Sequence, residues 1–116
     1  MNADTLLFFD RAPAALPLYA LLEERVLAMH PACRAVVQRS QIAFDCGRRF
    51  AFASLRGKRL VVSFGLPERI DSPRIRQAVE PYPGRWTHHV LLEDPAQLDD
   101  ELLGWIAQAC AFAARK

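Results

Sequence analysis

The stretch RFAFASLRGKRLVVSFGLP, residues 49–67, decides the fold of this 116-residue chain. It contains two runs of alternating residues, rich in aromatic and β-branched side chains, a pattern typical of β-strands. Gly57 lies between the runs, where a tight hairpin turn favours glycine. Phe50 and Phe52 are expected to share one face of the first strand. The apolar side of the second strand is expected to consist of Leu60, Val62, Phe64 and Leu66. The stretch therefore predicts an antiparallel β-hairpin.

Shorter runs on both sides extend this hairpin into a sheet. RAVVQRS at 34–40 and QIAFDC at 41–46 precede it, and both are typical of strands. The stretch between residues 67 and 83 is irregular. Within it, SPRIRQAVE is expected to hold one helical turn, with Ser72 as the cap and Pro73 in the first position.

Alternation resumes in RWTHHVLLE, residues 85–93. It places Trp86 and His88 on one face of a strand, together with Val90 and Leu92. Arg85 and His89 then lie on the other face, since successive side chains of a strand point to opposite sides. We therefore expect His88 to face the interior and His89 to face solvent.

Helices are predicted near both ends of the chain. The first begins between Ala14 and Pro17 and ends before Pro31, because proline is tolerated only in the first turn of a helix. The second begins after Asp94, a natural cap, and Gln97 three residues later completes a capping box.

The order of these elements predicts an α+β fold. We expect two layers, an antiparallel meander sheet of four to five strands with the N- and C-terminal helices packed on one face. A chain of this length is expected to form a single domain, residues 1–116. The apolar fraction of 52% is sufficient for a hydrophobic core.

Charge is concentrated in the middle of the sequence. Residues 48–89 contain nine Lys/Arg and three Asp/Glu, whereas the flanking segments are both net acidic and the whole chain is +2. A basic middle segment favours an anionic partner or becomes neutralised by its neighbours after folding. The first residues lack a basic segment and a long apolar run, so we expect a cytoplasmic protein without contact to a membrane.

Three cysteines, Cys33, Cys46 and Cys110, are far apart in the sequence. No CxxC pair is present, so the sequence gives little support for a zinc site, and we expect buried, reduced thiols. We expect no metal and no cofactor. The sequence contains no glycine-rich phosphate loop, nucleophile elbow or HExxH motif, so no catalytic residue is assigned and the chain is expected to be a binding module more than an enzyme.

The segment EPYPGRWTHH, residues 80–89, is the candidate site. Two prolines stiffen it, and prior rigidity lowers the entropic cost of binding. Arginine and aromatic side chains favour an anion, either a small molecule or a peptide carboxylate. The ligand-binding residues expected here are Tyr82, Arg85, Trp86 and His88, assisted by Lys58 or Arg59.

Three alternatives remain open at this stage. Nucleic acid could contact the basic segment 48–89, in which Phe50, Tyr82 and Trp86 are interleaved. An enzyme could use His88 as a general base, although a structural role for this histidine is favoured. A homodimer could form through Leu6, Leu7, Phe8 and Phe9, which are otherwise expected to cover the core.

The motifs SQIAF, FGLP, EPYPGRWTHHV and LDDELLGWIAQACAFA occur in an order that resembles an uncharacterised bacterial family, a domain of unknown function. Members of that family occur alone or as the C-terminal domain of chains labelled predicted transport proteins. The resemblance covers nearly the whole chain and implies a small cytoplasmic α+β domain with no established activity or cofactor. The positions that match the recurrent pattern are Gln41, Phe44, Gly65, Pro67, Arg85, Thr87 and His88.

Overall fold

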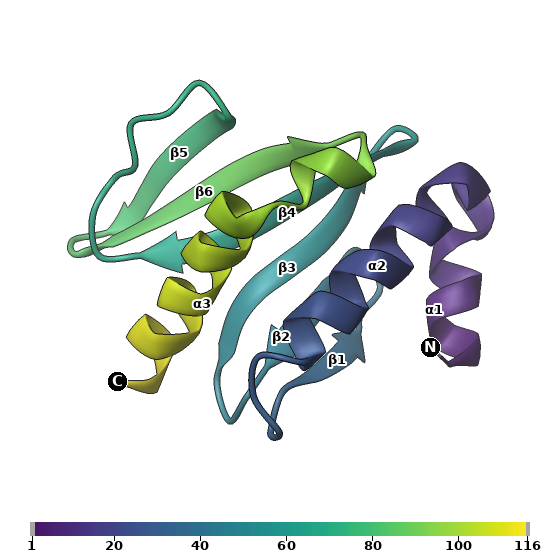
Figure 1. Ribbon diagram of the computed structural model, residues 1–116, viewed down its shortest axis with the longest axis horizontal. Coiled ribbons are helices and arrows are strands. Elements are labelled where there is room, and N and C mark those ends of the chain that lie inside the picture. Colours follow the sequence, from purple (N-terminus) through teal and green to yellow (C-terminus); the bar gives the residue numbers. More distant parts are fainter. Residues whose placement is uncertain (1, 116) are drawn as a thin grey trace.

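The computed structural model describes residues 2–115 and shows an antiparallel sheet with helices on one face (Figure 1). The strands are β1 Arg34–Val37, β2 Ile42–Asp45, β3 Arg49–Arg56, β4 Arg59–Leu66, β5 Ile75–Tyr82 and β6 Arg85–Leu92. The helices are α1 Ala3–Phe8, α2 Leu16–Leu27 and α3 Asp100–Ala114, with 3₁₀ turns at Phe9–Arg11, Pro13–Ala15 and Pro95–Gln97. The α+β prediction is confirmed, but the sheet has six strands in the order β1-β2-β3-β4-β6-β5, not four to five.

The additional strand is β5, in the stretch predicted to hold a helical turn. Ser72 and Pro73 give a local helix-start signal, but the backbone forms a hydrogen-bonded turn that is not helical, closed by the bond from the Ile75 amide to the Ser72 carbonyl. From Ile75 onward the chain pairs with β6, so tertiary pairing overrides the local preference. The helical turn was therefore a wrong prediction.

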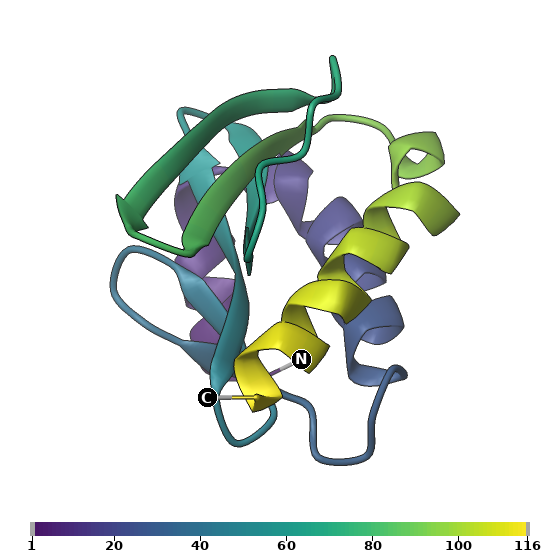
Figure 2. The same ribbon diagram turned by 90° about the vertical axis from the view of Figure 1, so that its left-hand side faces the viewer.

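The two long helices form the second layer (Figure 2). Both α2 and α3 lie on the same side of the sheet and contact each other, as the sequence predicted. We call this side the covered face and the opposite side the open face. The capping box at Asp94 and Gln97 is present, but it caps a 3₁₀ turn; Asp99 caps α3, which begins at Asp100.

The core lies between the covered face and the helices. Its largest fully buried side chains include Phe44 and Phe64 from the sheet and Leu22 and Ile106 from the helices. Phe50 is also buried, whereas Phe52 is half-buried and lines a groove on the open face, so these two residues do not share a face. The reason is an irregularity in the pairing of β2 with β3, which adds one residue to β3 at Phe50.

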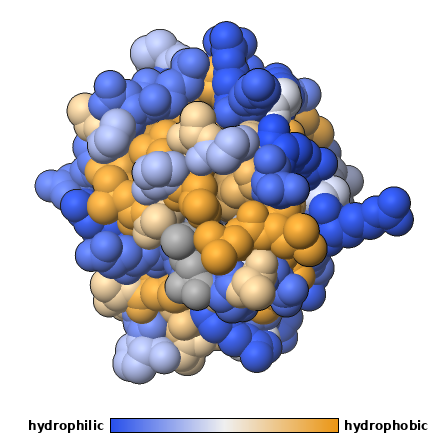
Figure 3. Space-filling view, turned by 90° about the vertical axis from the view of Figure 1, so that its right-hand side faces the viewer, coloured by the Kyte–Doolittle hydropathy of each residue, from blue (hydrophilic) through white to orange (hydrophobic). Residues whose placement is uncertain are grey.

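The N-terminal segment divides between core and surface. Phe8 and Phe9 are buried, whereas Leu6 and Leu7 are 52% and 72% exposed. The surface on this side of the molecule has a broad apolar area (Figure 3). A homodimer contact could therefore use Leu6 and Leu7 but not the two phenylalanines, and self-association stays a prediction. Within residues 2–115, no helix has the length and apolar character needed to cross a bilayer.

Candidate functional site

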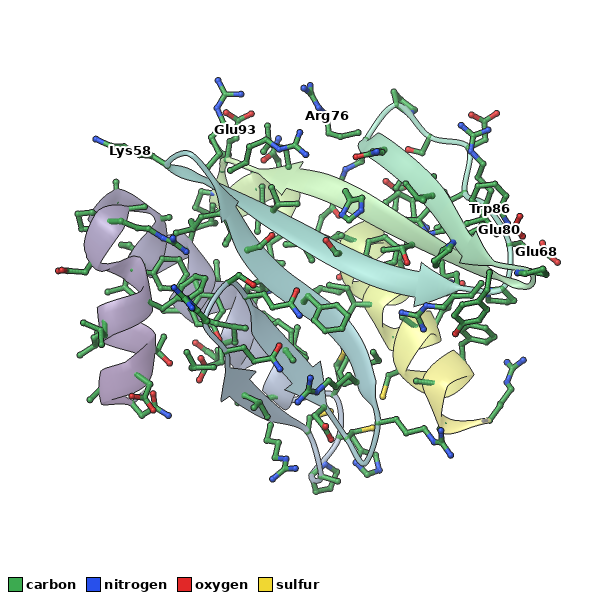
Figure 4. The ribbon with its side chains drawn as sticks, turned by 180° about the vertical axis from the view of Figure 1, so that it is seen from behind. Lys58, Glu68, Arg76, Glu80, Trp86 and Glu93 are labelled. Atoms are coloured by element: carbon green, nitrogen blue, oxygen red, sulfur yellow. The ribbon has the colours of Figure 1, made fainter. Side chains whose placement is uncertain are left out.

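The six residues predicted to bind a ligand do not lie together. Trp86 and His88 are on the covered face, whereas Arg85 is on the open face, as the alternation of β6 requires. Lys58 lies in the turn between β3 and β4, at the end of the sheet opposite to Trp86 (Figure 4). The structure therefore distributes these residues over two faces and two ends of the sheet.

His88 is fully buried, which confirms that it faces the interior. Its Nε2 atom accepts a hydrogen bond of 2.9 Å from the Ile70 amide, and its ring stacks on Phe64 with centroids 5.4 Å apart. Burial lowers the pKa of His88, so the ring is neutral near pH 7. His88 therefore holds the segment between β4 and β5 against the core, and no substrate can reach its nitrogen in this arrangement.

Arg85 lies flat against the backbone of β4. A Cβ atom added at Gly65 would meet the Arg85 guanidinium carbon at 2.6 Å, so the glycine provides the space that the guanidinium occupies. Tyr82 pairs with Arg85 in the strand register, across the turn formed by Pro83 and Gly84. Proline followed by a glycine with φ of 84° suits a tight two-residue turn. The predicted rigid loop is thus the turn of a β-hairpin.

The open face contains a groove that was not predicted from the sequence. It has a volume of about 410 Å³ and includes Phe52, Arg56, Ser63, Thr87 and His89 in its lining. A smaller cavity of about 30 Å³ adjoins it, and Arg56, Val61 and His89 line both. We call the two together the open-face groove. Its remaining lining residues are Gln41, Ser54, Leu55, Arg59, Arg76, Gln77 and Leu91.

A hydrogen-bonded pair lies in the lining of this groove. Ser63 Oγ and His89 Nδ1 are 2.7 Å apart, on neighbouring strands that place the two residues directly opposite each other. Burial, together with the positive charge of Arg56, lowers the pKa of His89. The ring is therefore neutral at pH 7 and can donate or accept through the nitrogen that does not face Ser63.

Positive charge surrounds the pair. Arg56 and Arg76 make no ion pair with any residue of the described range 2–115. Among the described residues, Arg59 forms an ion pair only with Glu93, at 3.8 Å, and both side chains are more than half exposed. Exposed pairs of this kind contribute little to stability, so all three guanidinium groups are available to a ligand.

Arg74 shows the contrasting case of an arginine with a structural role. Its guanidinium contacts Asp99 at 2.8 Å and Glu101 at 3.1 Å, and it also donates to the Gln97 carbonyl. Its carbon lies 5.9 Å from the ring centre of Trp105. This arginine therefore attaches the start of β5 to the start of α3 and adds no free charge to the surface.

A larger hollow, of about 630 Å³, lies beside α1 and β1. Its lining includes two acidic residues, Asp4 and Asp10, and two basic residues, Arg11 and Arg39. The mixed charge gives no preference for one class of ligand. The open-face groove, lined by basic side chains and no acidic ones, is the better candidate site.

Only Arg59 of the six predicted residues lines the groove. Some groove residues that were not predicted nevertheless have a weak signal in the sequence. Ser63 is the polar residue in the middle of the apolar run RLVVSFGL, and Arg56 and Arg59 flank a tight turn on the same face. The position of Arg76 in the groove could not be predicted, because β5 was not recognised as a strand.

The three cysteines form a second cluster of side chains that are capable of chemistry. They are free thiols whose sulfur atoms lie within 4.8 Å of one another. Each is half-buried, not fully buried as the sequence analysis expected.

The structure defines a class of protein, a small α+β domain in which two helices cover one face of a six-stranded sheet and leave the other face open. The family model of a domain of unknown function, DUF5655, matches residues 7–113. The chain belongs to this family, which confirms the predicted membership of a family without known function. No curated protein and no solved structure shows significant similarity to the chain.

Proposed function

We propose that this protein is a binding module whose open-face groove accepts the anionic group of a small molecule or a peptide, either a phosphate or a carboxylate. The observation that supports this most strongly is the presence of Arg56 and Arg76, without acidic partners among residues 2–115, at a groove whose lining includes the His89–Ser63 pair. Guanidinium groups bind phosphate and carboxylate oxygens through paired, charge-assisted hydrogen bonds.

The neutral groups of the groove complement this charge. Ser54, Ser63 and Thr87 place hydroxyl groups along its floor, and hydroxyls donate to anionic oxygens. His89 adds a ring nitrogen that becomes a donor when protonated. Several convergent donors beside apolar side chains such as Phe52 and Val61 are typical of small-molecule sites.

The placement of the aromatic residues favours a compact ligand over nucleic acid. Of the three aromatic residues interleaved with the basic segment, Phe50 is buried and Trp86 lies on the covered face, which leaves Tyr82 at the end of β5 on the open face. These three residues therefore do not form the row of successive aromatic contacts that single-stranded nucleic acid would need. A catalytic role for His88 has no support from the geometry, because the ring is buried and hydrogen-bonded to Ile70.

The proposal also includes the cellular location, the cytoplasm of a bacterium. Three free thiols fit the reducing conditions of a cytoplasm, and the resemblance of the motifs points to a bacterial one.

The test is a binding screen by thermal shift and calorimetry with inorganic phosphate, nucleotides, acyl phosphates and short carboxylates. A ligand should stabilise the protein, and Arg56→Ala should weaken its binding by about tenfold or more, as expected for loss of a hydrogen bond to a charged group. Arg76→Ala should act in the same direction. Arg85→Ala is the matched control, since this arginine lies on the same face but outside the groove, and its removal should leave affinity unchanged.

Two outcomes would contradict the proposal. One is a bound anion whose affinity falls with Arg85→Ala and not with Arg56→Ala, which would move the site to the turn of the β5–β6 hairpin. The other is tight binding of DNA or RNA that weakens steeply with salt while no small anion binds, which would favour the nucleic-acid alternative.

A further inference from the structure

The fold brings together three cysteines that are far apart in the sequence. The register of β1 and β2 pairs Arg34 with Asp45, and its continuation by one residue sets Cys33 opposite Cys46. Cys110 comes from α3, which packs on β3 and β4, one turn after the buried Ile106. Three separate elements thus contribute one thiol each to the same place.

Local bonds fix two of the three backbones. The Cys33 amide donates to the His30 carbonyl at 3.0 Å, and the Cys46 amide donates to the Arg48 carbonyl at 3.1 Å. Gly47, with φ of 92°, permits the turn that follows Cys46. The third backbone is the interior of a helix. The positions of the sulfur atoms are therefore set by the fold and do not depend on a flexible loop.

The spacing of the sulfur atoms matches the coordination of one metal ion. The Sγ atoms of Cys46 and Cys110 are 3.2 Å apart, and all three lie within 4.8 Å of one another. Thiolates bound to one zinc ion at about 2.3 Å lie roughly 4 Å from each other. Small rotations of the side chains would bring the three sulfurs to that separation.

We propose that Cys33, Cys46 and Cys110 form a three-thiolate site for a single thiophilic metal ion, Zn²⁺ or Cu⁺. Thiolates are the soft ligands that these two ions prefer. Three sulfurs complete a trigonal site for Cu⁺, whereas Zn²⁺ would keep a fourth position for water or an exogenous ligand. Each thiol that binds the ion releases its proton to the solvent.

Two of the free thiols have a raised pKa, so a bound ion must displace their protons. Burial and the neighbouring Cys46 raise the pKa of Cys33, and burial together with both neighbouring thiols raises the pKa of Cys110 to about 12. Without a cation, Cys33 and Cys110 therefore stay protonated near neutral pH. A bound cation would offset the mutual repulsion of the thiolates, and the partial exposure of all three side chains leaves a route of entry.

The test uses the reduced full-length chain, titrated with Zn²⁺ and, without oxygen, with Cu⁺. Native mass spectrometry should show one ion per chain, and Co²⁺ should give the sulfur-to-metal absorption bands of thiolate ligation. Each of the variants Cys33→Ser, Cys46→Ser and Cys110→Ser should lose the ion. His30→Ala is the matched control, because His30 is exposed, lies in the same loop as Cys33 and is outside the sulfur cluster.

A second measurement does not depend on how the variants fold. Alkylation of the wild-type thiols should slow for all three cysteines when one equivalent of metal is present. Absence of binding, protection of only two thiols, or loss of binding in His30→Ala would overturn the proposal. So would a reduced chain that binds no metal and, on exposure to air, forms a Cys46–Cys110 disulfide, since the cluster would then be a redox pair.

Discussion

His88 and His89 are consecutive residues of β6, yet they lie in opposite environments. His88 points to the covered face, is fully buried and is hydrogen-bonded to Ile70. His89 points to the open face, is half-buried and is bonded to Ser63 in a groove bordered by arginines. The same strand therefore supplies a packing residue and a candidate binding residue in two adjacent positions.

The two faces of the sheet have different roles. The covered face contains nearly all the large buried side chains, so it supplies most of the hydrophobic stabilisation. The open face contributes little to the core. It can therefore carry charged side chains without ion-pair partners among residues 2–115, such as Arg56 and Arg76. Substitutions at equivalent positions on the two faces should separate stability from binding.

The largest difference is expected between two phenylalanines on neighbouring strands. Phe64→Ala on the covered face should lower the free energy of unfolding by about 3–5 kcal/mol, because it leaves a cavity beside His88 and Trp105. Phe52→Ala on the open face should cost only about 1 kcal/mol, since this ring is half-buried. Urea denaturation of both variants measures the two values. Equal losses would show that the faces do not differ in this way.

The two histidines should show a smaller difference of the same sign. His88→Ala should cost about 2–4 kcal/mol, because it removes buried volume and leaves the Ile70 amide without its acceptor. His89→Ala should change stability by less than about 1 kcal/mol, as is usual for residues near the surface, but should weaken anion binding. Denaturation and calorimetry on each variant check both parts. A stable His88→Ala protein would contradict the structural role assigned to this ring.

A pH dependence should follow from both rings. Burial lowers the pKa of His88 and of His89 in the folded state below about 6.5, the value of an unfolded chain. Below that pH the unfolded state binds more protons, so stability should be fully present above pH 6.5 and fall as the pH decreases through the folded pKa values. Denaturation midpoints between pH 7.5 and 5 measure this, with the ordinary carboxylates titrating at still lower pH. His88→Gln should reduce the slope; an unchanged slope in that variant would assign the effect to other groups.

The smallest effect is expected at Gly65. An added methyl group would displace only the end of the Arg85 side chain, which is flexible, so Gly65→Ala should cost less than about 1 kcal/mol. Anion binding in the open-face groove should stay intact, because Arg85 is outside it. The thermal midpoint and the affinity for the ligand identified in the screen are the two measurements. A large loss of stability would mean that the Arg85–Gly65 contact holds the sheet together.

Much of the architecture could be predicted because the periodic signals are strong. Alternation in residues 49–66 and 85–92 gave the central strands, and the buried side of β6 was assigned correctly. β5 was missed because Ser72 and Pro73 imitate the start of a helix, and only pairing with β6 makes the segment a strand. The start of α3 was placed too early for a similar reason, since the capping box at Asp94 is real but closes a 3₁₀ turn.

The candidate site was less predictable because it depends on which strands become neighbours. Arg85, Trp86 and His88 were assigned to one site because they are close in the sequence. The alternation of side chains along β6 places Arg85 on the opposite face from the other two. The pairing of Ser63 with His89 requires β4 and β6 to be adjacent, which no local pattern specifies. The cysteine cluster needs the β1–β2 register and the position of α3 together, so spacing in the sequence could not reveal it.

The strand order has a consequence for how the chain folds. β6 lies between β4 and β5, although β5 comes first along the chain, so β6 must return from the turn at Pro83 and Gly84 before it can meet β4. The β5–β6 hairpin involves short-range contacts and is expected to form early, then dock as one unit. Arg56 and Ser63 lie in β3 and β4, on one side of the β4–β6 contact, and His89 lies in β6, on the other side. The open-face groove should therefore form only when the β5–β6 hairpin docks on β4. A folding intermediate that precedes this step would contain strands but could not bind an anion in the groove.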